Sequence, residues 1–303
     1  MTLFRQALAN FQLLPLTITL QLQSDGELPP FKGSMWHGWL GHALKQVSEP
    51  AFTALYQQHD HEQPKPYAIQ PGYDQKTQWR RGECIDFGLT LFGQATELWP
   101  VLLNALHAGQ ILGIGPARIK LRLVTVAVRT PTGNSLDIQP HSLGAFLQPW
   151  EEGSEPSLCQ VHLQLRTPLR LKHKGQLVQH PDGLTPQLLA KQARRRLMQL
   201  TRYWVADDPA LLQAIDQQPL GCQDVQLLPS LYYEDWQRFS LRQQEFLSFG
   251  GLKGGLACQG MVQPFYRWLQ LAALLQLGGK TTFGLGCIEL APGSSSAGFQ
   301  GIE

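Results

Sequence analysis

The stretch that decides the fold lies near the end of the chain and reads Leu277-Gly278-Gly279-Lys280-Thr281-Thr282-Phe283-Gly284-Leu285-Gly286. An apolar helix precedes it, and the strand-like run Cys287-Ile288-Glu289-Leu290 follows it. Four glycines within nine positions make a loop whose backbone can lie against a ligand. Its N–H groups and Lys280 suit phosphate oxygens. The alternative is a helix that ends at Gly278 and leads into a glycine-kinked strand. Either way, the helix-loop-strand order is the reverse of a nucleotide P-loop.

Outward from this loop, the first half of the chain shows alternating strand and helix patterns. The run 16–22 alternates leucine and isoleucine with polar residues, which is the period of a half-buried strand. A helix is expected over 34–47 with Ser34 as its N-cap, and a long polar loop follows from about 48 to 81. Further elements expected in this half are strands at 66–71, 85–92 and 118–128 and a helix at 96–110, with Pro100 in its first turns.

The second half repeats this pattern. A strand around 161–165 is followed by a helix from Pro186 to Trp204. Strands at 225–230 and 254–261, a helix opened by Pro264 and a final strand complete the set. The sequence therefore predicts an α+β protein of two tandem ferredoxin-like (RRM-like) β-α-β-β-α-β domains. We expect these domains at 1–140 and 155–292, joined by a linker at about 138–157 and followed by a linker-like tail at 293–303.

Composition limits the class of protein. With 303 residues, 43% of them hydrophobic, the chain can bury two ordinary cores. A net charge of +2 is too small to identify a nucleic-acid partner, so a binding surface must come from local clusters of Lys and Arg. The five cysteines show no C-x-x-C spacing, which argues against zinc and against a disulfide framework. We expect a reduced, cytoplasmic protein whose apolar N-terminus is a strand, with no signal peptide or membrane span.

The helix predicted at 34–47 carries two histidines. Its apolar face is centred between Trp36 and Leu40, and His42 and Lys45 fall roughly opposite that face, about 60° apart. Because side chains lean toward the helix N-terminus, His42 should lie over the bare backbone at Gly38, where a phosphate could approach. His37 lies on the flank of the apolar stripe and is expected to pack beside Trp36. A surface or half-buried role without chemistry is the alternative for either histidine.

A second basic surface is expected on the helix at 186–204. Lys191, Arg195 and Arg202 lie within about 40° of each other, opposite the apolar face. The neighbouring run from Arg166 to Lys174 also has few acids to balance it, so a track for RNA phosphates is predicted, with a solvated helix face as the alternative. His59-Asp60-His61 lies in a polar loop without further ligand spacing, so no metal site is predicted there.

Several motifs in order resemble one family. They are the glycine loop, Gly82-Glu83 with 87–93, 113–118, 167–172 and 250–254. Together they resemble the CRISPR-associated repeat-processing endoribonucleases of the repeat-associated mysterious protein superfamily. The resemblance implies tandem ferredoxin-like domains that bind a CRISPR repeat RNA and cut it without metal or cofactor. The ribose 2′-OH attacks the adjacent phosphate and leaves a 2′,3′-cyclic phosphate and a 5′-OH end. That chemistry needs a base, an acid and a cation.

The resemblance also assigns residues. It places catalysis on or beside the first helix, where His42, His37 and Lys45 are available, as a histidine with one lysine or as a histidine pair. Some members carry a tyrosine just before this helix, but residues 24–33 contain none. The residues expected to bind RNA are Lys32, Arg170, Lys172, Lys191, Arg195, Arg202, Gly278, Gly279, Lys280, Thr281, Thr282, Phe283, Gly284 and Gly286.

Three functions remain open at this point. The first is a metal-independent endoribonuclease that cuts CRISPR precursor transcripts into guide RNAs, with repeat RNA and other CRISPR effector or adaptation proteins as partners. The second is a non-catalytic RNA-binding subunit of a CRISPR interference complex. The third is an unrelated α+β enzyme that uses the glycine loop for a small phosphorylated ligand. The histidine and lysine opposite the apolar face favour the first over the second, and the two ferredoxin-like repeats favour either over the third.

Overall fold

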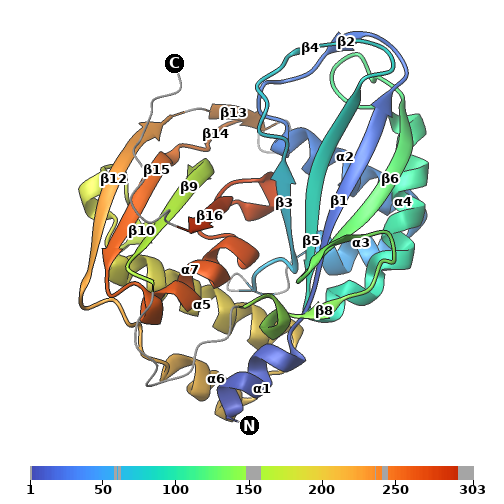
Figure 1. Cartoon of the computed structure of the whole chain (residues 1–303). Helices are drawn as coiled ribbons and strands as arrows, with labels where there is room; N and C mark the ends of the chain where they lie inside the picture. Colours follow the sequence, from blue (N-terminus) through green and yellow to red (C-terminus); the bar gives the residue numbers. More distant parts are fainter. Residues whose placement is uncertain are drawn as a thin grey trace.

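The protein consists of two antiparallel sheets, each with helices packed on one face (Figure 1). The structure is a computed structural model that describes residues 2–57, 60, 63–147, 158–235, 237–240 and 245–292. The first sheet carries α2 and α4, and the second carries α5 and α7 (Figure 1). The predicted α+β class with two tandem ferredoxin-like units is confirmed.

The first unit follows the β-α-β-β-α-β order. Its elements are β1 (Gln12–Leu22), α2 (Gly33–Val47), β3 (Tyr67–Pro71), β5 (Cys84–Phe92), α4 (Trp99–Leu112) and β6 (Leu121–Thr130). The strands lie in the order β3-β5-β1-β6, so the first strand of the unit is central. Short additions are β2 (Gly26–Glu27), β4 (Gln78–Trp79), β7 (Gly133–Ser135) and β8 (His141–Ser142). The alternation predicted for β1 is present, because Leu16, Ile18 and Leu20 are buried and Thr17 is exposed.

The second unit repeats this topology. Its elements are β9 (Gln160–Leu169), α5 (Pro186–Trp204), β12 (Val225–Glu234), β15 (Gly251–Gly260), α7 (Gln263–Leu275) and β16 (Ile288–Pro292). The sheet order β12-β15-β9-β16 matches that of the first unit, position by position. Shorter elements are β10 (Lys172–His173), β11 (Gln176–Leu177), α6 (Pro209–Asp216), β13 (Gln237–Ser240) and β14 (Glu245–Ser248). The helix predicted at 186–204 has the predicted bounds.

Helix α1 (Leu3–Asn10) corrects the expectation of a strand at the N-terminus. The Thr2 side chain accepts a hydrogen bond from the N–H of Arg5, which caps the helix, and Phe4, Ala7 and Leu8 form its buried face. That face packs against the second unit, where the rings of Phe4 and Trp268 lie 6.5 Å apart. Helices α1 and α6 accordingly lie side by side beneath the second unit (Figure 1). The segment before β1 therefore ties the two units together.

Helix α3 (Glu49–Tyr56) lies where the sequence predicted a long polar loop. Ser48 caps it by accepting the N–H of Ala51, and Pro50 stands in the first turn, where it has no helical N–H to lose. The helix predicted at 96–110 begins later, because 93–98 forms the 3₁₀ turn η1 (Gly93–Leu98). Smaller 3₁₀ turns are η2 (Leu143–Phe146), η3 (Pro181–Gly183) and η4 (Thr281–Phe283).

The glycine loop lies at the seam between the two units. Its turn η4 contacts both α2 and β3 of the first unit. Just before it, the buried side chain of Gln276 donates to the carbonyl of Ile69 on β3, at 3.1 Å. The fold therefore brings the two stretches that the sequence singled out, the first helix and the glycine loop, into direct contact.

Candidate RNA-processing site

His42 lies on the exposed side of α2, as predicted. Its ring atom Nδ1 is 2.8 Å from the carbonyl oxygen of Gly38, one turn earlier. Because a carbonyl oxygen only accepts hydrogen bonds, Nδ1 carries the proton and the lone pair of the neutral ring is on Nε2. A Cβ built at Gly38 would meet no atom within 4 Å, so the helix surface beside His42 is open. This arrangement leaves the lone pair of Nε2 free of the helix backbone.

Lys45 is also exposed, one turn after His42. Its ammonium nitrogen lies 5.5 Å from the centre of the Phe52 ring on α3. The Phe52 ring in turn stacks on Tyr56, with centroids 5.1 Å apart and planes 12° apart. A cation over an aromatic ring in an exposed position is held only weakly. Lys45 is therefore available to a phosphate at the surface of α2.

His37 lies instead at the seam, half-buried among aromatic rings. Its ring centre is 4.0 Å from that of Phe283 in the glycine loop and 4.9 Å from that of Tyr56. Its Nδ1 is 3.0 Å from the hydroxyl of Tyr67, and the Tyr56 hydroxyl donates to its carbonyl at 2.9 Å. Burial raises the pKa of both tyrosines, so both stay protonated. His37 therefore joins the two units through these contacts.

The two tyrosines were missed by the sequence analysis. Tyr56 belongs to α3, a helix hidden within the predicted polar loop, and Tyr67 is the first residue of β3. The available signal was the Ser48-Glu49-Pro50 start, a capping residue followed by a proline in the first turn. A helix predicted from it would have carried Phe52 and Tyr56 toward α2.

Three glycines of the loop have positive φ angles, which are 83° at Gly278, 85° at Gly284 and 75° at Gly286. A Cβ at these positions would overlap the Arg170 carbonyl, the Pro71 ring and the Leu277 carbonyl, respectively. Gly279 is exposed and its φ is ordinary. Backbone conformation and packing therefore account for Gly278, Gly284 and Gly286, so contact with RNA stays a prediction for them.

The non-glycine residues of the loop are held by the second unit. Lys280 has a φ of 65°, and its ammonium donates to the carbonyl of Ser248 at 2.8 Å and lies 4.1 Å from the Phe249 ring centre. Thr281 and Thr282 are buried, at 6% and 7% exposed. Phe283 is half-buried and turns its ring to His37. The loop thus exposes Gly279 to solvent, and it exposes Gly278, Lys280 and Phe283 only in part.

Arg170 supports the glycine loop through both its side chain and its backbone. Its guanidinium donates to the Gly250 carbonyl at 2.9 Å, and its own carbonyl accepts the N–H of Gly279 at 2.9 Å. Lys172 lies two residues further along, exposed in the β10-β11 hairpin. Arg170 and Lys172 are therefore brought near the loop, the first as a support and the second as a surface cation.

Lys32 requires a correction, because its side chain is 0% exposed. Its ammonium donates to Asp74 Oδ1 at 2.9 Å and to the Lys76 carbonyl at 3.0 Å, with the Pro30 and Asp74 carbonyls at 3.4 Å. An ammonium group has three hydrogens, and these oxygens use them all. Lys32 fastens the 72–77 loop to the start of α2 and does not offer a charge to RNA.

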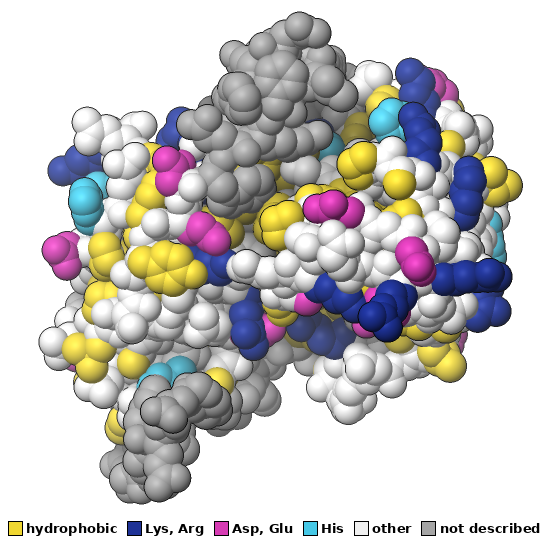
Figure 2. All heavy atoms as spheres, turned by 90° about the horizontal axis from the view of Figure 1, so that it is seen from above, with side chains coloured by type: hydrophobic (Ala, Val, Ile, Leu, Met, Phe, Trp, Pro, Cys, Tyr) yellow, Lys and Arg dark blue, Asp and Glu magenta, His cyan; other side chains and the backbone are white. Residues whose placement is uncertain are grey.

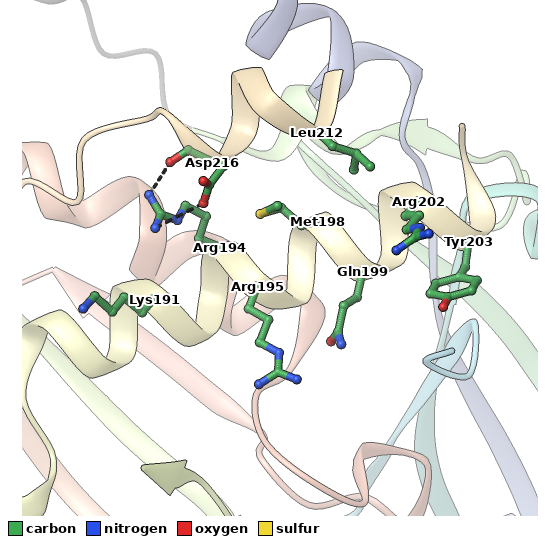
Figure 3. Close-up of a pocket in the computed structure, with 9 residues that line it drawn as sticks. All are labelled: Lys191, Arg194, Arg195, Met198, Gln199, Arg202, Tyr203, Leu212 and Asp216. Atoms are coloured by element: carbon green, nitrogen blue, oxygen red, sulfur yellow. Dashed lines mark hydrogen bonds and ion pairs between the residues drawn. The ribbon is translucent and has the colours of Figure 1, made fainter. Parts of the chain in front are cut away.

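The basic face predicted on α5 is present, and we call Lys191, Arg195 and Arg202 the α5 ridge. These side chains are exposed and line a shallow cavity of about 320 Å³ between α5 and α6, whose floor includes Met198 and Leu212 (Figure 3). Arg194 turns toward α6, where it forms an ion pair with Asp216 (Figure 3). Arg202 is 3.3 Å from Asp207, but both side chains are more than half exposed, so the pair is weak.

Charge elsewhere on the surface is mixed. On the face seen from above, Lys and Arg side chains are more numerous over the half that carries the first sheet, with acids among them (Figure 2). Of the triplet 59–61, only Asp60 lies within the described residues, and it accepts the Tyr203 hydroxyl at 2.6 Å. The described part of the chain contains no group of three or more metal-ligating side chains. None of its helices has the length and apolar character that a bilayer span requires.

Comparison with known families fits this geometry. The family model of the CRISPR-associated endoribonuclease Cas6 matches residues 163–288, and a model described as an N-terminal domain matches residues 11–143. The Cas6 family model thus spans the second unit, from β9 to the start of β16. The resemblance seen in the sequence is thereby confirmed, and with it a role in CRISPR repeat RNA processing by an endoribonuclease family.

Solved Cas6 structures share the fold. A Cas6 product complex has a TM-score of 0.57 at 19% identity and covers 92% of this chain and 99% of its own. Thermus thermophilus Cas6 has a TM-score of 0.54 at 18% identity, covering 93% and 99%. A partial Cas6-RT-Cas1–Cas2 complex has a TM-score of 0.62 at 16% identity, covering 97% of this chain and 48% of that one. No curated protein matches.

Proposed function

We propose that this protein cuts CRISPR repeat RNA without a metal ion, with His42 as the proton-transfer residue. The observation that carries the proposal is the Nδ1–Gly38 hydrogen bond, which leaves the basic nitrogen Nε2 beside an open stretch of α2. Lys45 stands one turn away as an exposed cation. A base and a cation on one open helix face are two of the groups that transfer of a phosphate to the 2′-oxygen requires.

In the proposed reaction, Nε2 of neutral His42 takes the proton of the ribose 2′-OH. The 2′-oxygen then forms a bond to phosphorus, and the bond from phosphorus to the 5′-oxygen breaks. The Lys45 ammonium stabilises the charge on the phosphorane, and the departing 5′-oxygen takes a proton from Lys45 or from water. The products are a 2′,3′-cyclic phosphate and a 5′-OH end, so atoms and charge balance without a cofactor.

RNA would be held on both sides of α2. The glycine loop adjoins the start of this helix, and the α5 ridge supplies three exposed cations on the second unit. At its C-terminal end α5 touches the loop that follows α3, because Trp204 donates to the Pro64 carbonyl at 2.8 Å. We propose the α5 ridge, Lys172 and Gly279 with Lys280 as phosphate contacts.

The test is to incubate the protein with repeat RNA in EDTA and to read the cut position and the end chemistry. We expect a single cut that leaves a cyclic phosphate, at the same rate with and without EDTA. Cleavage only with added metal would contradict the mechanism. Binding without any cut would favour the second function, a non-catalytic RNA-binding subunit.

A partnership with CRISPR adaptation proteins is a further part of the proposal. One of the fold neighbours is a Cas6-RT-Cas1–Cas2 complex, and 97% of this chain superimposes on it. Co-purification of this protein with Cas1 and Cas2 from the same locus would test it. We expect a complex that survives nuclease treatment if the contact is between proteins and one that dissociates if RNA bridges them.

A further inference from the structure

Arg196 is the member of the Arg194-Arg195-Arg196 run that turns inward. Its Nε donates to the carbonyl of Leu275 at 3.3 Å, and one terminal nitrogen donates to the Thr281 hydroxyl at 3.4 Å. Its guanidinium carbon is 5.6 Å from the centre of the Phe92 ring on β5. Arg196 therefore touches the end of α7, the glycine loop and the first unit at once, directly behind η4.

The charge of Arg196 is balanced differently from that of its neighbours. Arg194 and Arg202 pair with Asp216 and Asp207, whereas Arg196 makes no ion pair within the part of the chain that the structure describes. Its two acceptors, the Leu275 carbonyl and the Thr281 hydroxyl, are neutral oxygens. Burial lowers the pKa of the guanidinium to about 10, which still leaves it charged at neutral pH. A partly buried charge without a carboxylate partner is costly, so an external anion would relieve it.

We propose that Arg196 is a positioning residue for RNA: it holds Thr281 in place and keeps a positive charge behind the glycine loop that a phosphate of bound RNA balances. This rests on the proposed function of the loop. Thr281 matters because its carbonyl accepts the N–H of Gly284 and so closes the η4 turn. The charge matters because electrostatic attraction is stronger in a partly buried site than in water. Arg196 would act from behind the loop, without touching RNA.

A matched pair of variants separates the charge from the structural role. Arg196→Lys and Arg196→Gln both replace the guanidinium with a single nitrogen donor, and only the lysine keeps the charge. The probe is repeat RNA with a 2′-deoxy nucleotide at the cut site, bound to the full chain across a salt series. We expect Arg196→Gln to weaken binding about tenfold, the equivalent of about 1.4 kcal/mol. Arg196→Lys should stay within about threefold of the parent, with similar melting temperatures for both variants.

Arg267 provides the control. It is a half-buried arginine on α7, 5.0 Å from the Phe4 ring and 5.6 Å from the Trp268 ring, eight residues before the end of the helix. Arg267→Gln should leave RNA affinity unchanged. Equal losses of affinity in Arg196→Lys and Arg196→Gln would make Arg196 a structural cap only and overturn the inference, as would full binding by Arg196→Gln. Failure of the unsubstituted protein to bind repeat RNA would instead overturn the proposed function, and this inference with it.

Discussion

Two sets of basic side chains surround the candidate site, and they differ in what they bond to. The outward set, Lys45, Lys191, Arg195 and Arg202, is exposed on α2 and α5. The inward set is Lys32, Arg170 and Arg196, whose nitrogens donate to oxygens of the protein. All seven look alike in the sequence. Only the outward set can exchange water for phosphate at little cost, so we expect variants of the outward set to lose RNA contacts and variants of the inward set to act through the protein structure or through the charge behind the glycine loop.

The largest effect is expected beside the outward set, at His42. His42→Ala should slow cleavage of repeat RNA by about 10²-fold or more, because general acid-base catalysis is typically worth that much. RNA affinity should change little, since the side chain is exposed and hydrogen-bonds to Gly38 of its own helix. Single-turnover cleavage and equilibrium binding measure the two effects.

His37→Ala is the companion variant. It removes the contacts with Phe283 and Tyr67 and should lower the melting temperature while slowing cleavage less than His42→Ala. Full cleavage activity in His42→Ala would show that His42 is not the proton-transfer residue. A folded but inactive His37→Ala would transfer the proton-transfer role to His37.

Within the inward set, Lys32→Ala should be the most destabilising change. It removes the ammonium from Asp74 Oδ1, which keeps only the N–H of Lys76, and from the Lys76 carbonyl, which keeps only the indole N–H of Trp79. We expect a loss of about 2 kcal/mol in the free energy of unfolding. RNA affinity of the folded protein should be unchanged. Urea titration and RNA binding below the unfolding transition test this, with exposed Lys172→Ala as the control that should keep its stability. Weaker binding with unchanged stability in Lys32→Ala would restore Lys32 as an RNA contact.

Gly284→Ala probes the loop itself. At a φ of 85° and against the Pro71 ring, an added Cβ should destabilise the protein by about 1 kcal/mol or more. Gly279→Ala is the matched control, because its φ is ordinary and its nearest neighbour to a Cβ is the flexible Arg170 side chain, at 3.8 Å. If Gly284→Ala keeps its melting temperature and loses RNA affinity, the glycine is there for RNA and not for packing.

The smallest effects per residue are expected on the α5 ridge. Each of Lys191→Ala, Arg195→Ala and Arg202→Ala should lower the slope of log affinity against log salt by roughly 0.7 to 0.9 units. Arg202→Ala should change the slope least, because Asp207 already offsets part of the charge of Arg202. Stability should stay the same in all three. An unchanged slope in the triple variant would identify the ridge as a solvated helix face.

The contrast between the two sets also marks where sequence reasoning succeeds. The strands and helices follow from local periodicity, and α5 was predicted residue for residue because its apolar face and its Thr185-Pro186 start are both local signals. The burial of Lys32 could not be predicted from nearby residues, because its partner Asp74 lies 42 residues away in the sequence. The same holds for the positive φ of Gly284, which is tied to the position of Pro71 on the other unit.

Helix α3 was missed in the sequence analysis for a different reason. Its eight residues give too few apolar repeats for periodicity to stand out from the surrounding polar stretch. Its cap, however, was readable in the sequence. The seam around His37 depends on three elements that are distant in sequence, and no single window of residues contains that information.

Helix α1 has a consequence for the order of folding. It is made before every other element of the described chain, yet its ring partner Trp268 is on α7, 264 residues after Phe4. Contacts of such long sequence separation form late, because the loop between them must close first. During synthesis η2, β8 and α6 can contact α1 before α7 is made, but Phe4 lacks its Trp268 partner until α7 has left the ribosome. The docking of α1 is then the step that completes the second core.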